Sequence, residues 1–117
     1  MTDVTGAGAP PGYLRAARLG DVPDGGLLGV VVGGRPVCLV RRGRVVTALA
    51  DRCTHAEFPL SEGELLADGT VQCAWHGARF DARTGEPMQQ PAHGGSCPAI
   101  RVFDVLILDD DVHVRLA

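Results

Sequence analysis

Short apolar stretches separated by glycine-rich turns run through most of the chain. Their Val, Leu and Ile content suits strands that pack one face against a core. No helical period of useful length is present, apart from a single turn predicted near Ser61–Leu65. We therefore predict an all-β chain with strands at Tyr13–Arg18, Leu27–Val32, Pro36–Arg41, Val45–Ala50, Thr70–Cys73, Ala78–Asp81, Val102–Leu108 and Val112–Leu116.

Turn residues lie between these predicted strands. Gly33-Gly34 supplies the positive φ that a tight hairpin needs. The other predicted turns are Arg42-Gly43, Asp68-Gly69, Thr84-Gly85 and Asp109–Asp111. Regularly spaced short strands with such turns indicate an antiparallel sandwich or a small barrel.

Length and composition limit what the chain can be. Its 117 residues, 45% hydrophobic and 21% charged, suit one small globular domain. The net charge is −3, and all 11 basic residues are scattered Arg, which argues against a nucleic-acid partner. Residues 1–12 lack a signal-peptide pattern and read as a disordered lead, and no apolar run is long enough to span a membrane. We expect a cytoplasmic protein.

Two Cys/His pairs carry the concentrated chemistry. Cys53-Thr54-His55 and Cys73-Ala74-Trp75-His76 are separated by residues 56–72, so two loops each offer one thiolate and one imidazole. Thiolate and imidazole are ligands that iron, zinc and copper prefer. Zinc sites usually pair like ligands within a loop, whereas a Rieske-type [2Fe–2S] centre has two Cys on one iron and two His on the other. The four cysteines of the chain could form two disulfides in a secreted protein, but the interleaved histidines favour a metal site.

The motifs around these ligands resemble those of Rieske-type ferredoxins. The matching stretches are CTHAEFPLSEG, VQCAWHGARFDARTGEP and QQPA, and the resemblance covers roughly residues 11 to 115. It implies one domain over residues 13–117, an antiparallel β-sandwich with a cluster-binding subdomain inserted at about residues 51–93. It also implies one [2Fe–2S] cluster per chain, with Cys53 and Cys73 on the inner iron and His55 and His76 on the outer, reducible one.

The resemblance also implies an activity and partners. The protein would be a one-electron carrier and not an enzyme by itself. It would pass electrons from a flavin-containing ferredoxin reductase to a terminal ring-hydroxylating oxygenase. Because a carrier must release its partners quickly, we expect a monomer that forms weak, transient complexes.

Two features point to a low reduction potential. Rieske proteins of cytochrome bc complexes carry an extra Cys in each loop and hydroxyls that hydrogen-bond the cluster sulfurs. The corresponding disulfide positions here are Phe58, or its neighbour Glu57, and Trp75, and the hydroxyl positions are Ala78 and Phe80. Since hydrogen bonds to sulfur stabilise the reduced cluster, we predict a potential of about −150 mV.

The remaining Cys and His residues have simpler interpretations. Cys38 lies in the middle of a predicted strand, where a free cysteine behaves as a small hydrophobe. His113 alternates with two valines, so we expect it to face outward, and His93 is interpreted as a surface histidine. Cys97 lies in a segment, residues 93–99, that is longer than in most such ferredoxins, and no role is predicted for it.

Two other classes of function stay open at this point. The four ligands could hold zinc, or a cluster that acts as a sensor, in a structural or regulatory module. The chain could also be a non-catalytic small subunit of a permanent redox complex. Related small proteins occur in nitrite reduction and iron–sulfur assembly.

Overall fold

The computed structural model describes residues 9–52, 59–74, 77–89 and 98–116. Short strands account for most of these residues, as the sequence predicts. The two helical segments are single 3-10 turns, η1 (Leu19–Asp21) and η2 (Leu60–Glu62). The strands are β1 (Tyr13–Arg18), β2 (Gly26–Val32), β3 (Arg35–Arg42), β4 (Val45–Ala50), β5 (Glu64–Leu65), β6 (Thr70–Gln72), β7 (Arg79–Asp81), β8 (Pro87–Gln89), β9 (Val102–Leu108) and β10 (Asp111–Arg115).

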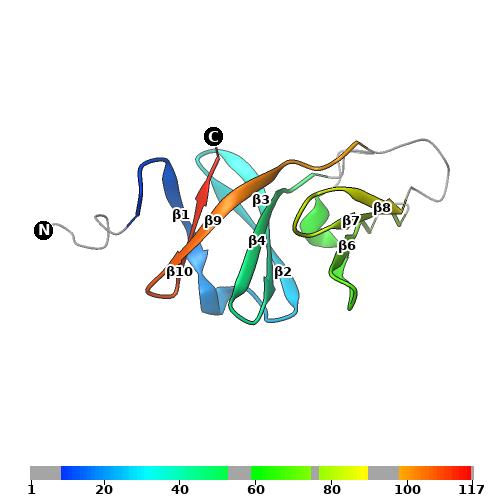
Figure 1. Cartoon of the computed structure of the whole chain (residues 1–117), viewed down its shortest axis with the longest axis horizontal. Helices are drawn as coiled ribbons and strands as arrows, with labels where there is room; N and C mark the ends of the chain where they lie inside the picture. The colour runs from blue at the N-terminus through cyan, green and yellow to red at the C-terminus, as the bar shows by residue number, and fades with distance from the viewer. Residues whose placement is uncertain (1–8, 53–58, 75–76, 90–97, 117) are drawn as a thin grey trace, which may run out of the picture.

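A six-stranded antiparallel sheet forms the larger part of the fold. Its strand order is β1-β10-β9-β4-β3-β2. The two edge strands, β1 and β2, contact each other, so the sheet curls on itself. The β2–β3 turn contributes to this closure, because a Cβ at Gly33 would lie 3.0 Å from side-chain atoms of both Leu14 and Leu116. Figure 1 shows this part on the side of the N-terminus.

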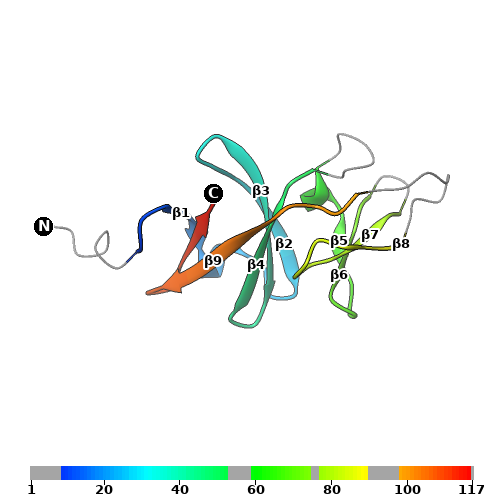
Figure 2. The same cartoon turned by 45° about the horizontal axis from the view of Figure 1, so that its top comes forward.

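A four-stranded antiparallel sheet, of order β5-β6-β7-β8, lies beside the larger one. The chain leaves the larger sheet after β4 and returns to it at β9, so the small sheet is an insertion (Figure 2). The all-β antiparallel architecture with an inserted subdomain is therefore confirmed. The boundaries predicted for the lead, residues 1–12, and for the subdomain, residues 51–93, stay predictions, since residues 1–8 and 90–97 lie outside the described ranges.

Two apolar clusters fill the fold. The first, which we call the barrel core, lies within the curled sheet and consists of Ala17, Leu19, Val22, Val32, Val37, Leu39, Val46, Ala48, Val112 and Val114. The second, the inter-sheet core, joins β3 and β4 to the small sheet and consists of Cys38, Val40, Leu49, Leu60, Val71, Cys73, Ala78, Phe80, Ala82 and Ile100. Alternate residues of β3 belong to different clusters, because successive side chains of a strand point to opposite faces.

Two-residue hairpins connect several of the strands. The predicted Gly33-Gly34 turn is confirmed, with φ of 54° and 81°. The β9–β10 turn is shorter than predicted. It consists of Asp109 and Asp110, with φ of 50° and 63°, and Asp111 already pairs with Leu108. Asp tolerates the left-handed region better than most residues, which allows a turn whose twist matches that of the strands.

His113 points away from the barrel core that holds Val112 and Val114, as an outward-facing residue should, but it is not exposed to solvent. His113 is only 9% exposed, and it lies opposite Leu106 of β9 and Arg15 of β1. Because β10 lies between two strands, His113 has a side chain directly opposite it on each side, and both lie on its own face of the sheet. Alternation along one strand gives the direction of a side chain, but the exposure of that side chain depends on the flanking strands.

Candidate functional site

The second predicted ligand loop is the connection of the β6–β7 hairpin. Cys73 directly follows β6, is 1% exposed, and donates its backbone N–H to the carbonyl oxygen of Ala78 over 2.8 Å. Gly77, with φ of 73°, makes the positive-φ bend at the end of this connection. The hairpin therefore fixes the backbone of Cys73 within the small sheet. His76 lies outside the described residues.

The first predicted ligand loop leaves the larger sheet after β4. Its two ligands, Cys53 and His55, lie outside the described residues, so the structure shows only what flanks them. On one side is Asp51, whose backbone N–H donates to the carbonyl of Pro36 on β3 over 3.1 Å. On the other side is η2, which begins at Leu60, a fully buried residue of the inter-sheet core.

The two predicted loops meet at Gly63, the glycine of the LSEG motif. A Cβ at Gly63 would lie 1.8 Å from the carbonyl oxygen of Gln72, the residue before Cys73. Only a glycine allows the first loop to come this close to β6. A small cavity of about 180 Å³ adjoins the junction and is lined by residues of both loops, Glu62, Gly63, Glu64, Gln72, Cys73 and Ala74. The fold thus holds the bases of both loops side by side.

The glycine of the later TG motif has a similar role. Gly85 has φ of 77°, and a Cβ there would lie 1.9 Å from the carbonyl oxygen of Ile100. The backbone N–H of Ile100 donates to the carbonyl of Gly85 over 2.8 Å. This contact ties the turn before β8 to the segment that leads into β9. The predicted proline loop, which includes Pro91 and Ala92, lies between them and outside the described residues.

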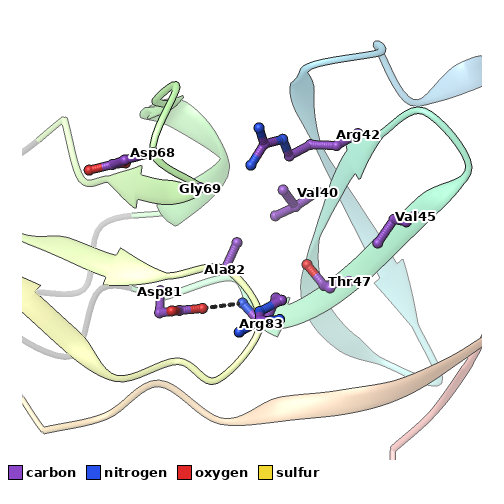
Figure 3. Close-up of a pocket in the computed structure, with 9 residues that line it drawn as sticks. All are labelled: Val40, Arg42, Val45, Thr47, Asp68, Gly69, Asp81, Ala82 and Arg83. Atoms are coloured by element: carbon purple, nitrogen blue, oxygen red, sulfur yellow. Dashed lines mark hydrogen bonds between the residues drawn. The ribbon is translucent and has the colours of Figure 1, made fainter.

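A larger cavity in the described part of the chain lies elsewhere. It measures about 440 Å³, lies between the two sheets and is lined by Val40, Arg42, Val45, Thr47, Asp68, Gly69, Asp81, Ala82 and Arg83 (Figure 3). The Asp81 carboxylate is occupied by its own turn, since it accepts from the backbone N–H groups of Arg83 and Thr84. None of these lining residues is Cys or His. Cys73, the one predicted ligand that the structure describes, is therefore not part of this cavity.

Cys38 belongs to the core, as the sequence predicts. It is fully buried in the inter-sheet core, and burial, followed by the nearby charge of Asp51, raises the pKa of its thiol. A thiol held in its protonated form is a poor metal ligand. Among the described residues, no group of three or more Cys, His, Asp or Glu side chains is arranged to hold a metal ion, and three of the four predicted ligands lie outside them.

Comparison with known proteins decides the family. The model of the Rieske [2Fe–2S] domain matches residues 12–104. The chain belongs to the Rieske [2Fe–2S] domain family. This membership implies one Rieske-type [2Fe–2S] cluster as the cofactor.

Named relatives of this Rieske chain are ferredoxins. It is 38% identical over 97 residues to the ferredoxin component of biphenyl 2,3-dioxygenase from Rhodococcus jostii, covering 83% of this chain and 86% of that one. Among solved structures, the ferredoxin of carbazole 1,9a-dioxygenase from Nocardioides aromaticivorans is 32% identical, with a TM-score of 0.79 and coverage of 87% and 95%. A complex of reduced oxygenase and oxidised ferredoxin in carbazole 1,9a-dioxygenase contains a chain 30% identical, with a TM-score of 0.76 and coverage of 91% and 94%.

These similarities extend over nearly the whole length of the ferredoxin chains. This Rieske protein is accordingly an electron carrier of the ferredoxin kind found in ring-hydroxylating dioxygenase systems, and it does not catalyse a reaction by itself. No helix in the described residues is long and apolar enough to cross a membrane.

The sequence did not reveal one polar contact at this site. The Asp51 carboxylate accepts hydrogen bonds from the backbone N–H and the hydroxyl of Ser61, both at 2.6 Å. The only sequence signal was position, since Asp51 stands two residues before Cys53 and Ser61 lies within the LSEG motif. Nothing in the local pattern indicates that the two side chains meet.

Proposed function

We propose that Cys53, His55, Cys73 and His76 hold the cluster of this Rieske ferredoxin. The observation that carries the proposal is the junction of Gly63 with Gln72, because it brings together the bases of the two loops that bear these residues. The two cysteines would bind one iron and the two histidines the other. The donor set, two thiolates and two imidazoles, fits iron in such a cluster.

The residues around Cys73 fit a buried thiolate ligand. Cys73 is 1% exposed, and an isolated thiolate would be costly to bury in the inter-sheet core. Binding to iron compensates that cost, because coordination neutralises the charge of the ligand. Its backbone N–H is already used by Ala78, which fixes the position of the residue.

A bound cluster supplies a one-electron couple, and the side chains around it adjust the potential of that couple. Ala78 and Phe80 are fully buried, and the side chain of neither can donate a hydrogen bond to a cluster sulfur. Both keep water away from the base of the second loop. The absence of hydroxyls at these two positions supports a potential near the low end of the Rieske range, about −150 mV.

The proposed partners are a flavin-containing reductase upstream and a terminal ring-hydroxylating oxygenase downstream. The support for the oxygenase is the solved complex between a relative and its oxygenase. The support for the reductase is the class of the relatives, which are ferredoxin components of dioxygenases. We propose that the chain is a cytoplasmic monomer whose complexes are small and short-lived, as electron-transfer interfaces usually are.

Optical and electron paramagnetic resonance spectra of the purified protein, before and after dithionite, test the cluster. We expect a reducible signal whose average g value lies below that of all-cysteine two-iron clusters. Cys73→Ser should abolish the signal, whereas Cys38→Ser, a change at an equally buried cysteine, should preserve it. A colourless protein that contains zinc and no acid-labile sulfide would overturn the proposal.

A further inference from the structure

A carboxylate and a hydroxyl close the base of the first ligand loop. The Oδ1 atom of Asp51 accepts from the backbone N–H of Ser61, and Oδ2 accepts from the Ser61 hydroxyl. Both distances are 2.6 Å, and the pair is partly buried. Hydrogen bonds to an ionised acceptor are shorter and stronger than neutral ones, and partial burial strengthens them further. The Asp51 side chain therefore holds the C-terminal end of the loop through two hydrogen bonds.

The position of the pair in the chain gives it a function. Asp51 lies two residues before Cys53, and Ser61 lies six residues after His55. The pair therefore spans the segment that carries both ligands of the first loop. Joining the ends of a loop removes much of the freedom of the residues between them.

The larger sheet supports the Asp51 side of the pair. The Asp51 backbone N–H is bonded to Pro36 of β3. Gly29 of β2 packs directly against both partners, since a Cβ there would lie 2.5 Å from the Ser61 hydroxyl and 2.9 Å from Oδ2 of Asp51. The absence of a side chain at position 29 leaves the room that the pair occupies.

We propose that the Asp51–Ser61 pair, with Gly29 as its wall, is a positioning clamp for the first ligand loop. The clamp rests on the proposed function, because its purpose is to hold Cys53 and His55 in place for the cluster. Asp51 and Ser61 act through the loop. Their loss should therefore change how firmly the cluster is held, beyond any loss of general stability.

Three variants break the clamp in different ways. Asp51→Ala removes both hydrogen bonds, and Ser61→Ala removes the one from the hydroxyl. Gly29→Ala leaves both partners intact and inserts a methyl group between them and β2. If Asp51→Ala fails to fold or to assemble the cluster, the two milder variants still test the clamp.

Each type of change has a matched control within the chain. Asp68 accepts from the backbone N–H and the hydroxyl of Thr70 at 3.0 and 2.6 Å, and its Oδ2 lies 3.5 Å from Arg79 of β7. The Asp68–Thr70 pair spans only the turn before β6 and encloses no predicted ligand. Asp68→Ala is therefore the control for Asp51→Ala. Gly20 has open space around it, because a Cβ there would meet nothing within 4 Å, so Gly20→Ala is the control for Gly29→Ala.

The primary measurement is the rate at which an iron chelator removes iron from the folded, oxidised protein. We expect release about tenfold faster in the clamp variants, the effect of losing one charge-assisted hydrogen bond. The electron paramagnetic resonance signal should broaden or shift in the same variants. Both control variants should match the wild type in the rate of iron release and in the spectrum. This should hold even where denaturant unfolding shows that a control variant loses as much stability as the clamp variant it is matched to.

The outcomes separate the clamp from the proposed function. If the wild type carries a cluster and the clamp variants release iron at the wild-type rate with unchanged spectra, the clamp is overturned alone. If Asp68→Ala releases iron as fast as Asp51→Ala at equal stability, the effect is general and the clamp is again overturned. A wild type that binds no iron and sulfide overturns the proposed function, and the clamp with it.

Discussion

Cys38 and Cys73 lie in the same inter-sheet core, yet their chemistry is expected to differ. Both are almost fully buried. Cys38 stands within a regular strand, where the backbone leaves no loop to bring a metal to it. Cys73 stands at the end of β6, where the hairpin connection begins. A cysteine within a strand thus packs in the core, whereas a cysteine at the start of a loop is available as a ligand. In the sequence, the nearby His76 is what marks Cys73 as the proposed ligand.

The raised pKa of the Cys38 thiol predicts a loss of stability at high pH. Above the ordinary thiol pKa of 9.0 the unfolded chain loses this proton while the folded chain keeps it. The contribution is therefore full below that pH and falls as pH rises, by up to about 1.4 kcal/mol per pH unit. Denaturant unfolding between about pH 8 and pH 10 measures the slope.

The Cys38→Ala variant is the control for this slope. It should lose less stability than the wild type over the same pH range, because it has no thiol to ionise on unfolding. Identical slopes in the two proteins would contradict the assignment to Cys38.

A hydroxyl at position 78 should raise the reduction potential. Ala78→Ser would place a donor where high-potential Rieske proteins have one, and a donated hydrogen bond stabilises the reduced cluster. Ala82→Ser is the matched control, since Ala82 is also a buried alanine of the inter-sheet core. Voltammetry should show a higher potential for the first variant and the wild-type value for the second. Equal potentials would show that position 78 does not reach the cluster.

At the scale of elements, the longer strands could be predicted from the sequence and the shortest could not. The bounds of β1, β4 and β9 agree with the apolar runs in the sequence. The strands β5 and β8 were missed, because two or three residues such as Glu64–Leu65 or Pro87–Gln89 contain no alternation to detect. Their pairing partners, β6 and β7, create them. The helical turn predicted at Ser61–Leu65 is the shorter 3-10 turn Leu60–Glu62, since β5 begins at Glu64.

Two glycines with positive φ should respond differently to Ala. Gly43, with φ of 64°, has open space around it, so Gly43→Ala should cost about 1 kcal/mol for the left-handed backbone. Gly85→Ala adds a collision with the carbonyl of Ile100, and we expect a loss of about 3 kcal/mol or more. Denaturant unfolding measures both. Equal losses would mean that the turn before β8 can move away from Ile100.

At the scale of the whole molecule, we expect the larger sheet to be more stable than the small sheet, because the two sheets draw on different cores. The barrel core draws its residues from η1, the segment after it and the larger sheet, whereas the inter-sheet core includes Cys73 and most of the small sheet's buried residues. The larger sheet can therefore bury apolar surface without help from the cluster. The small sheet has short strands and depends on contacts around the ligand loops.

Removal of the cluster should loosen the small sheet first. After iron is chelated, we expect hydrogen exchange to accelerate in β6 and β7 while protection persists in β3, β4 and β10. Mass spectrometry of exchanged peptides measures the difference. Uniform loss of protection across both sheets would show that the fold is one cooperative unit.

The contacts between separate elements are what the sequence could not supply. The family motifs indicated the ligands. The same motifs contain glycines, but the sequence alone does not show why a glycine is needed at those positions. The reason appears only when Gly63 meets Gln72 and Gly85 meets Ile100. The Asp51–Ser61 contact and the burial of His113 likewise depend on how separate elements pack together.

The pairing of β4 with β9 has a consequence for how such proteins diversify. Ala50 donates its backbone N–H to Arg101 over 2.9 Å, directly where the insertion leaves and rejoins the larger sheet. The small sheet thus takes the place of the turn between two antiparallel strands, β4 and β9. The chain segments that lead into it and out of it are joined by this hydrogen bond. A module attached in this way can change its length or its contents without altering the register of the strands that carry it. Evolution can therefore exchange the redox end of the molecule while keeping its scaffold.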